Sequence, residues 1–198
     1  GNLEALYTSK NTSDVGAHIC VLDVERGLVQ TINPQPWQTD TCIGGWHYDK
    51  RVYDKNSYKT AKTVIDLLCD IVSRNGNLML NVPLPNAGWP DDKELAVVDD
   101  LTAWMAVNSE AIYATRPYKI LGDGPVANTP PSGRFNESSR KSMDASDVRY
   151  TTKGDTLYAL VMGIPTAREA SIPSLGTAAK QGVGKIQSVE LLGIGKVP

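Results

Sequence analysis

The chain has 198 residues, of which 41% are hydrophobic and 21% are charged, and its formal net charge is −2. This composition is typical of a globular chain with one domain, or one domain and part of another, and acidic and basic residues are mixed along it. We therefore expect no nucleic-acid partner. Because no apolar run approaches the roughly 18 residues of a membrane-spanning helix, we also expect no membrane partner.

The cysteines and histidines give no metal-binding or disulfide pattern. Cys20, Cys42 and Cys69 are odd in number and widely spaced, so they are expected to be buried free thiols. His18 and His47 are too far apart for a local metal motif. The sequence therefore predicts neither a metal site nor a cofactor.

Three short segments are expected to form strands. Residues 17–22 are continuously apolar, as in a strand that is buried on both faces of a parallel sheet. Residues 38–43 indicate a second, more polar strand, and residues 77–82 indicate a third that Pro83 ends.

Two helices are expected between and after these strands. Residues 57–75 predict a helix with Ser57 as N-cap and Gly76 just past its end. Its apolar residues recur at spacings of three and four, on a single face: Val64, Leu67, Leu68, Ile71 and Val72. Residues 91–108 predict a second helix, with acidic residues at its start and an apolar stripe that includes Trp104. This alternation indicates an α/β architecture with parallel strands.

The composition changes after about residue 118. Residues 122–146 are rich in Gly, Pro, Ser and Asn and predict a linker or long loop. Residues 148–152 and 156–162 alternate around a turn, which predicts a β-hairpin, and residues 188–193 predict one more strand. We therefore divide the chain into residues 1–118 and a smaller antiparallel β unit at 119–198.

Glu25 is the first candidate catalytic residue, because it follows the first predicted strand directly. In barrels of alternating strands and helices, the carboxyl ends of the strands carry the catalytic groups. The alternative is a surface glutamate paired with Arg26. Asp23 would point the same way as Glu25 on an extended chain. Asp23 and Glu25 could be considered a catalytic pair, but a retaining glycosidase needs two carboxylates about 5–5.5 Å apart that flank the scissile bond. Neighbours two residues apart on one strand lie on the same side of any substrate. Asp23 is therefore interpreted as a structural acceptor for the backbone or Arg26.

Aromatic residues near Glu25 in the sequence are the next candidate site residues. Trp46 follows a predicted strand and two glycines, so its ring is a candidate for stacking on a sugar, or else packs in a core or interface. His47 is a candidate for orienting a carboxylate or a sugar hydroxyl, or is simply exposed. Trp37 and Trp104 are interpreted as packing residues, and Trp89 either lines a pocket mouth or is exposed.

Several linked segments resemble the α-L-fucosidases of glycoside hydrolase family 29. They include Asp-Val-Glu-Arg-Gly at 23–27, Pro-Trp-Gln-Thr-Asp-Thr-Cys-Ile-Gly-Gly-Trp-His-Tyr at 36–48, and Asn-Gly-Asn-Leu-Met-Leu-Asn-Val at 75–82. The resemblance continues through 90–95 and 104–117. It implies a retaining exo-glycosidase that removes terminal α-L-fucose. The implied fold is the C-terminal portion of a (β/α)8-like barrel followed by a partial antiparallel β-sandwich.

The same resemblance implies roles for individual residues. Glu25 matches the general acid/base and Trp46 matches an aromatic residue that lines the fucose pocket. The family's nucleophile is an Asp on an earlier strand. Only 24 residues precede Glu25, and neither Asp14, in a predicted loop, nor any other matches that motif.

The expected partners are a fucosylated oligosaccharide or glycoconjugate, and either a complementary chain or further copies of this chain that complete the barrel. The chain alone is expected to show no turnover. A secreted or periplasmic location is a further expectation from the family. The alternative function is a non-catalytic fragment or a sugar-binding module that uses Trp46.

Overall fold

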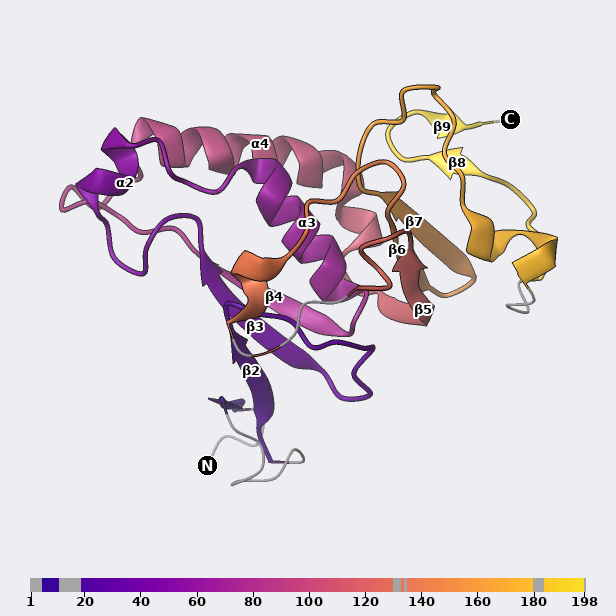
Figure 1. The fold of residues 1–198 in the computed structure, drawn as a ribbon, viewed down its shortest axis with the longest axis horizontal. Helices are drawn as coiled ribbons and strands as arrows, with labels where there is room; N and C mark the ends of the chain where they lie inside the picture. Colours follow the sequence, from indigo (N-terminus) through magenta and orange to yellow (C-terminus); the bar gives the residue numbers. More distant parts are fainter. Residues whose placement is uncertain (1–4, 11–18, 130–132, 134, 180–183, 198) are drawn as a thin grey trace.

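The computed structural model describes residues 5–10, 19–129, 133, 135–179 and 184–197, and the expectations on Asp14 and His18 lie outside this part of the chain. The described chain is mixed α/β, with a parallel sheet and an antiparallel sheet on either side of one central helix (Figure 1).

The parallel sheet has the order β1 (Thr8–Ser9), β2 (Val21–Glu25), β3 (Trp37–Cys42) and β4 (Gly76–Asn81). Successive side chains on a strand point to opposite faces. One face is apolar and packs against helix α3. The other face carries the polar residues Asp23, Glu25, Gln38, Asp40, Asn77 and Asn81, together with Met79. Met79 is 49% exposed, so this second face is accessible to solvent in the described chain.

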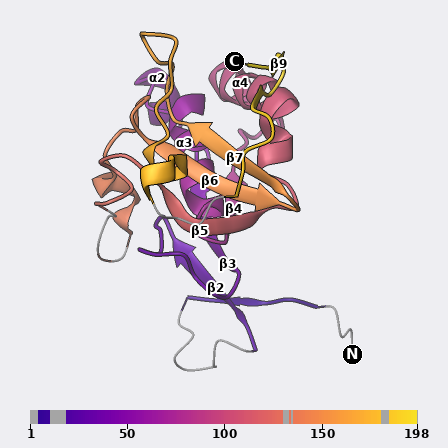
Figure 2. The ribbon, with the colours of Figure 1, turned by 90° about the vertical axis from the view of Figure 1, so that its right-hand side faces the viewer.

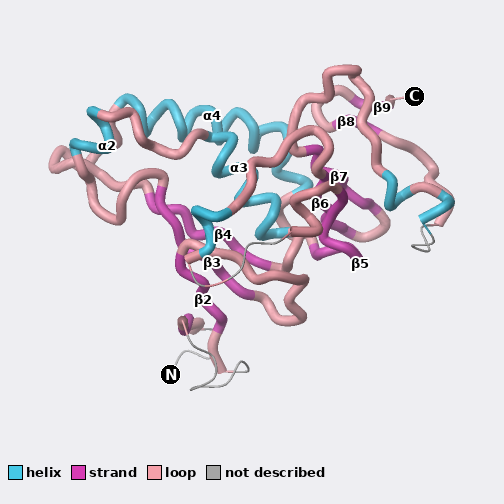
Figure 3. The backbone as a smooth tube through the Cα atoms, viewed as in Figure 1, coloured by secondary structure: helices cyan, strands magenta, loops and turns pink. Residues whose placement is uncertain are grey.

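Helix α3 (Ala61–Val72) is the centre of the molecule (Figure 3). Leu67 and Ile71 pack with Trp37 against the parallel sheet. Leu68 and Val72 instead join a second core with the antiparallel sheet. The predicted apolar face is confirmed, but it meets two cores rather than one, because the residues on its two sides pack against different sheets.

Helix α4 (Asp92–Asn108) confirms the second predicted helix. Asp91 caps it by accepting hydrogen bonds from the amides of Lys93 and Glu94, and the Glu94 carboxylate accepts from the Asp91 amide. Trp104 is half-buried and packs against the second core. A short helix, α2 (Lys50–Asp54), precedes α3, and the 3-10 turn η1 (Ser109–Ala111) follows α4.

The antiparallel sheet has the order β5 (Arg116–Asp123), β6 (Val148–Lys153) and β7 (Thr156–Val161). Figure 2 shows it as a separate layer from β2 and β3. Strands β6 and β7 confirm the predicted hairpin. Strand β5 was not predicted. It runs across residue 118, where the sequence analysis placed the boundary between the two parts of the chain, and this boundary stays a prediction. The remaining short elements are η2 (Asn136–Ser139), η3 (Pro173–Leu175), η4 (Thr177–Ala179), β8 (Glu190–Leu191) and β9 (Gly195–Lys196).

Two predicted boundaries are wrong for identifiable reasons. The first strand starts at Val21 rather than at residue 17, and it includes Glu25 as its last residue. Residues 17 and 18 lie outside the described chain, and Ile19 is 48% exposed rather than buried.

Helix α3 begins after Thr60, not Ser57. Lys59 is held in the connection to β3 by a bond from its amide to the carbonyl of Ile43 (2.7 Å). At the other end, Asn75 takes the left-handed conformation (φ +70°), and Gly76 already belongs to β4.

A buried carboxylate joins α3 to the antiparallel sheet. Asp70, with a side chain only 1% exposed, accepts from Arg74 on the same helix, from Arg149 Nε on β6 (2.6 Å) and from Arg140 Nη2 (3.1 Å). Burial opposes the charge of Asp70, but the three guanidinium groups outweigh it and lower its pKa. Removing this carboxylate would leave three arginines without their shared acceptor.

In the described residues, no helix is long and apolar enough to cross a membrane.

The packing of Gly76 against Trp37 gives a test of the fold. A Cβ atom at Gly76 would lie 2.5 Å from Trp37 Cε2 and 2.7 Å from Ile71 Cγ2. We expect Gly76→Ala to lower the free energy of unfolding by about 1–3 kcal/mol, because both neighbours are fully buried and must shift. Chemical denaturation measures this change. Gly184→Ala is the matched control, since a Cβ there meets nothing within 4 Å; an equal loss in both variants would contradict the packing.

Candidate active site

Glu25 lies at the carboxyl end of β2, on the solvent-accessible polar face of the parallel sheet. Its side chain is 34% exposed. Its register partner on β3 is Asp40, and Asp23 lies two residues back on the same face. Parallel strands therefore bring three carboxylates together at one end of the sheet.

Lys10 holds these carboxylates together. Its Nζ atom lies 3.0 Å from Asp23 Oδ2, 2.9 Å from each Asp40 oxygen and 3.9 Å from Glu25 Oε2. Burial opposes the charge of Lys10, but its hydrogen bonds to Asp40 and Asp23 outweigh that effect and raise its pKa. Asp23 is thus a structural acceptor as predicted, but its charged partner is Lys10 rather than Arg26. Of the three acids, Glu25 has the loosest contact with the lysine.

Arg26 connects the end of β2 to Trp46. Its backbone is in the left-handed region (φ +45°), which turns the chain sharply after Glu25. Its guanidinium carbon lies 5.4 Å from the centre of the Trp46 ring, and its Nη2 donates to Cys42 Sγ (2.8 Å). The pKa of Arg26 is raised, first by the bond to Cys42 and then by the charges of Glu137 and Glu25. The proposed pairing of Arg26 with Glu25 is therefore replaced by a stack on Trp46.

Trp46 and His47 line a hollow beside this turn, with residues 48 and 81–86. Trp46 is 37% exposed, and His47 is also exposed. The Asn81 side chain donates to the carbonyls of Gly45 (3.2 Å) and Trp46 (3.3 Å), so the end of β4 fixes the backbone of the loop. The hollow combines an aromatic surface with polar groups, which is the usual make-up of a small-molecule site.

A segment from the C-terminal half clasps the turn that follows Glu25. The buried Asn136 side chain accepts from the Leu28 amide (2.9 Å) and donates to the Leu28 carbonyl (3.1 Å). The next residue, Glu137, donates its amide to the Arg26 carbonyl (2.9 Å). Its carboxylate accepts from Thr41 Oγ1 (2.5 Å) and pairs with Lys59 Nζ (2.8 Å). The position of the Glu25–Arg26 turn therefore depends on residues more than 100 positions further along the chain.

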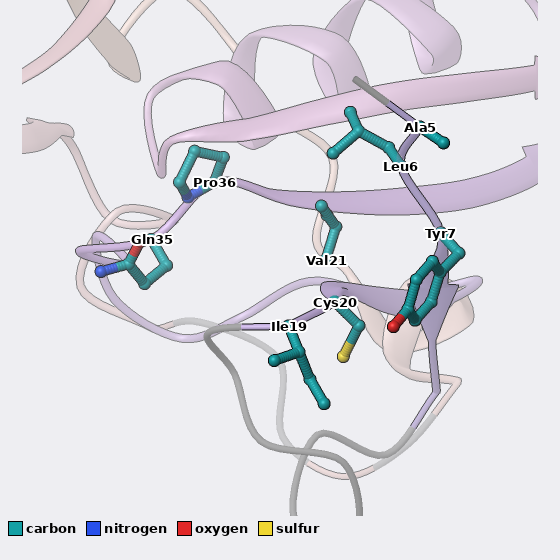
Figure 4. A pocket seen from close by; sticks show the side chains of 8 residues that line it. All are labelled: Ala5, Leu6, Tyr7, Ile19, Cys20, Val21, Gln35 and Pro36. Atoms are coloured by element: carbon teal, nitrogen blue, oxygen red, sulfur yellow. The ribbon is translucent and has the colours of Figure 1, made fainter. Parts of the chain in front are cut away.

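A second hollow lies at the opposite ends of the same strands. Figure 4 shows its lining of mostly apolar side chains from both sides of β2, with Leu6, Tyr7, Ile19 and Val21 among them. Val21 begins the strand that Glu25 ends, so this hollow is separated from the carboxylates by the length of β2. Among the described residues, this lining contains no carboxylate, imidazole, amine or guanidinium group, and we assign the hollow no chemistry.

The described residues contain no group of three or more His, Cys, Asp or Glu side chains that is arranged to hold a metal ion. The polar face carries the carboxylates of Asp23, Glu25 and Asp40. Asp23 and Asp40 are engaged by Lys10, whereas Glu25 stands at the strand end beside the turn to Trp46. A carboxyl group that is accessible at a strand end can transfer a proton to or from a group bound beside it.

The structure places the three predicted site residues near one another. Glu25 and Trp46 are linked through Arg26, and His47 follows Trp46 in the lining of the hollow. Trp37 is fully buried, as predicted, and Trp89 is 67% exposed. The residues that sequence reasoning missed are Lys10, Asp40, Asn136 and Glu137. Only Asp40 could have been found from the sequence, because it alternates with Thr39 and Thr41 on a predicted strand and must therefore lie on the opposite face from them.

Comparison with known proteins identifies the family. The family model described as Alpha-L-fucosidase matches residues 6–110, more than half of the chain, so the chain belongs to the α-L-fucosidase family. The tissue alpha-L-fucosidase of Bos taurus is 28% identical over 142 residues, which are 69% of this chain and 25% of that protein. An alpha-L-fucosidase of Branchiostoma floridae is 26% identical over 58% of this chain and 21% of its own length. The chain thus spans about a quarter or less of the curated relatives it matches.

Solved structures of fucosidases share the fold. A Bacteroides thetaiotaomicron GH29 alpha-L-fucosidase superposes with a TM-score of 0.64 and 19% identity, over 89% of this chain and 36% of that one. It was trapped as a covalent intermediate with 2-fluoro-fucosyl fluoride, in a variant with a glutamate replaced by glutamine. Alpha-L-fucosidase isoenzyme 1 of Paenibacillus thiaminolyticus is 27% identical, with a TM-score of 0.52 over 70% of this chain and 29% of its own.

The clasp can be tested through Asn136. Asn136→Ala would leave the buried amide and carbonyl of Leu28 without their side-chain partners. We expect it to lower the free energy of unfolding by about 1–3 kcal/mol and to speed hydrogen exchange at the Leu28 amide. Asn128→Ala, at an exposed side chain, is the control and should change stability by less than about 0.5 kcal/mol. Unchanged exchange at Leu28 in Asn136→Ala would show that the clasp does not form.

Proposed function

We propose that this chain carries the general acid/base of a retaining exo-glycosidase that hydrolyses terminal α-L-fucosyl linkages, and that Glu25 is this residue. One observation carries the proposal most. Glu25 stands at the carboxyl end of a parallel strand, on the polar face, one residue before the Arg26 that stacks on Trp46. This is where barrel enzymes place catalytic groups, and the position lies within the segment that the family model matches.

In the proposed mechanism, an Asp carboxylate upstream of this chain attacks the anomeric carbon while the Glu25 carboxyl group gives its proton to the leaving oxygen. The glycosidic bond breaks and a fucosyl ester of the Asp forms. Glu25, now a carboxylate, takes a proton from water as the water attacks the anomeric carbon. This step releases fucose and restores both groups. Trp46 and His47 bind the sugar, Trp46 through ring contact and His47 through a hydroxyl.

The polar face of the parallel sheet also supports a proposed architecture for the two parts of the chain. Residues 1–118 would form the later strands and helices of the (β/α)8-like barrel, and residues 119–198 a linker and part of the β-sandwich. The polar face of β2–β4 would then line the barrel interior. The parallel sheet, which is normally covered on both faces, would be completed by a complementary chain or by another copy. A secreted or periplasmic location is proposed with the family.

The alternative is a sugar-binding module without turnover. It is favoured by the exposure of Trp46 and His47 in a hollow, which requires no second carboxylate. Asp40 is the nearest candidate for such a carboxylate, but it lies beside Glu25 on the adjacent strand and both its oxygens contact Lys10. It therefore lies on the same side of a substrate as Glu25.

The role of Glu25 as a proton donor is tested by the leaving group. In the protein assembled with its complete barrel, we expect Glu25→Gln to cut kcat/KM about 10²- to 10⁴-fold for an aryl α-L-fucoside with a poor leaving group. For a dinitrophenyl fucoside the loss should be much smaller in the first step, because that leaving group departs without a proton. Steady-state and burst kinetics measure both.

Glu169→Gln, at an exposed glutamate, is the matched control and should leave both rates unchanged. An equal loss on both fucosides would remove Glu25 from the role of acid. Turnover by the purified 198-residue chain alone would contradict an external nucleophile and point to Asp40 or Asp23.

Sugar binding can be measured on the chain alone. We expect L-fucose to change tryptophan fluorescence, because a sugar on the exposed face of Trp46 replaces water there. D-fucose, the mirror image, is the matched control ligand and should have a smaller effect. Trp46→Leu should abolish the response, whereas Trp89→Leu should retain it; a response that survives Trp46→Leu would place the sugar elsewhere.

A further inference from the structure

Arg26 is held in an unfavourable backbone conformation beside the candidate site. Its φ of +45° lies in the left-handed region, which costs free energy for a residue with a side chain. Hydrogen bonds clamp this turn on both sides: the Arg26 amide donates to the Asp40 carbonyl (2.9 Å), and the Arg26 carbonyl accepts from the Glu137 amide (2.9 Å). Such strain concentrates at functional sites, where the surrounding structure imposes it. The direction in which the Arg26 side chain leaves the backbone is therefore fixed by strand β3 and by the segment around Glu137.

The Arg26 side chain is directed at an aromatic ring. Its guanidinium carbon lies 5.4 Å from the centre of the Trp46 ring. Nη2 donates to the sulfur of Cys42 (2.8 Å), which is a weak acceptor, and the buried Nε has no acceptor among the described residues. A buried donor without an acceptor costs free energy. The chain therefore accepts both a strained backbone and an unpaired donor to keep this cation over the ring.

The ring of Trp46 depends on a partner of this kind. Two glycines precede Trp46, and the Asn81 side chain donates to the carbonyls of Gly45 (3.2 Å) and Trp46 (3.3 Å). These bonds hold the backbone of the loop, whereas the side chain, which is 37% exposed, can still turn about its own bonds. A guanidinium group over one face of the indole restricts this rotation and removes that face from water.

We propose that Arg26 is a positioning residue for sugar binding, which covers one face of the Trp46 ring and leaves the opposite face as the platform for the C–H face of an L-fucosyl residue. The proposal rests on the proposed function, in which Trp46 binds the sugar. It adds that the angle of this platform is set by the residue directly after Glu25. One clamped residue therefore links the proposed proton donor to the ring on which the sugar lies. In the protein assembled with its complete barrel, loss of the Arg26 side chain should raise KM more than it lowers kcat.

Titration of the 198-residue chain with L-fucose, followed by tryptophan fluorescence, tests the role of Arg26. We expect Arg26→Met to raise the Kd for L-fucose about 3- to 30-fold, because the ring loses its cationic partner and turns freely. Arg26→Lys keeps a cation near the ring and should recover most of the affinity. Arg51→Met, at a side chain that is 83% exposed, is the control for a lost charge. Tyr158→Phe, which removes a hydrogen bond to Glu110 (2.5 Å) from the antiparallel sheet, is the control for lost stability. Both controls should bind L-fucose as the wild type does.

A crystal structure of the chain with L-fucose needs no variant and therefore decides the question even if Arg26→Met does not fold. We expect the sugar on the face of the Trp46 ring opposite the guanidinium group, with the stack of Arg26 intact. A sugar on the same face as Arg26, or a displaced Arg26, would overturn the proposal. So would wild-type affinity in Arg26→Met, or an equal loss in Tyr158→Phe. A wild-type chain that does not bind L-fucose would instead remove Trp46 from the sugar site, which contradicts the proposed function and the role of Arg26 together.

Discussion

The burial of Trp37 beneath helix α3 is the constraint on which the arrangement of the site depends. Its ring is fully buried, its Nε1 donates to the Arg74 carbonyl (2.9 Å), and Gly76 on the next strand leaves room for it. Because side chains alternate along a strand, seating Trp37 against the helix turns Asp40 to the other face. The parallel register then places Glu25 beside Asp40. The apolar packing thus decides which face of the sheet carries chemistry.

Two connections from the C-terminal half stabilise this arrangement. The Asp70 carboxylate ties α3, which supports the sheet, to strand β6. Asn136 and Glu137 hold the backbone of the turn after Glu25 and the side chain of Thr41. Asn136 and Glu137 fix the turn from which Arg26 reaches Trp46, so a change in the C-terminal half can reach the candidate site through hydrogen bonds.

Local sequence patterns predicted much of the fold. Strands β3 and β4, helix α4 and the β6–β7 hairpin follow from hydrophobic periodicity and turn residues. The ends of helix α3 were predicted wrongly because tertiary contacts determine them. At the start, the Lys59 side chain contacts the Cys42 carbonyl and the Glu137 carboxylate. At the end, Gly76 packs in the strand against the Trp37 ring. A helix that serves two cores also cannot be distinguished by periodicity from one with a single broad face.

The candidate site was predicted in part for the same reason. Glu25, Trp46 and His47 lie in contiguous motifs, so sequence reasoning found them. Lys10, Asn136 and Glu137 act across long separations, and no local pattern records that Asn136 will pair with Leu28. The arginine cluster is likewise invisible, because Asp70 and Arg149 are 79 positions apart.

The central claim is that Glu25 is one carboxylate of a pair whose other member lies outside this chain. Covalent trapping of the assembled protein with a 2-fluoro-fucosyl fluoride, followed by peptide mapping, tests it most directly, since such a reagent marks the nucleophile of a retaining enzyme as a stable ester. We expect the label on an aspartate outside residues 1–198. A label on Asp23, Asp40 or Glu25 would contradict the account.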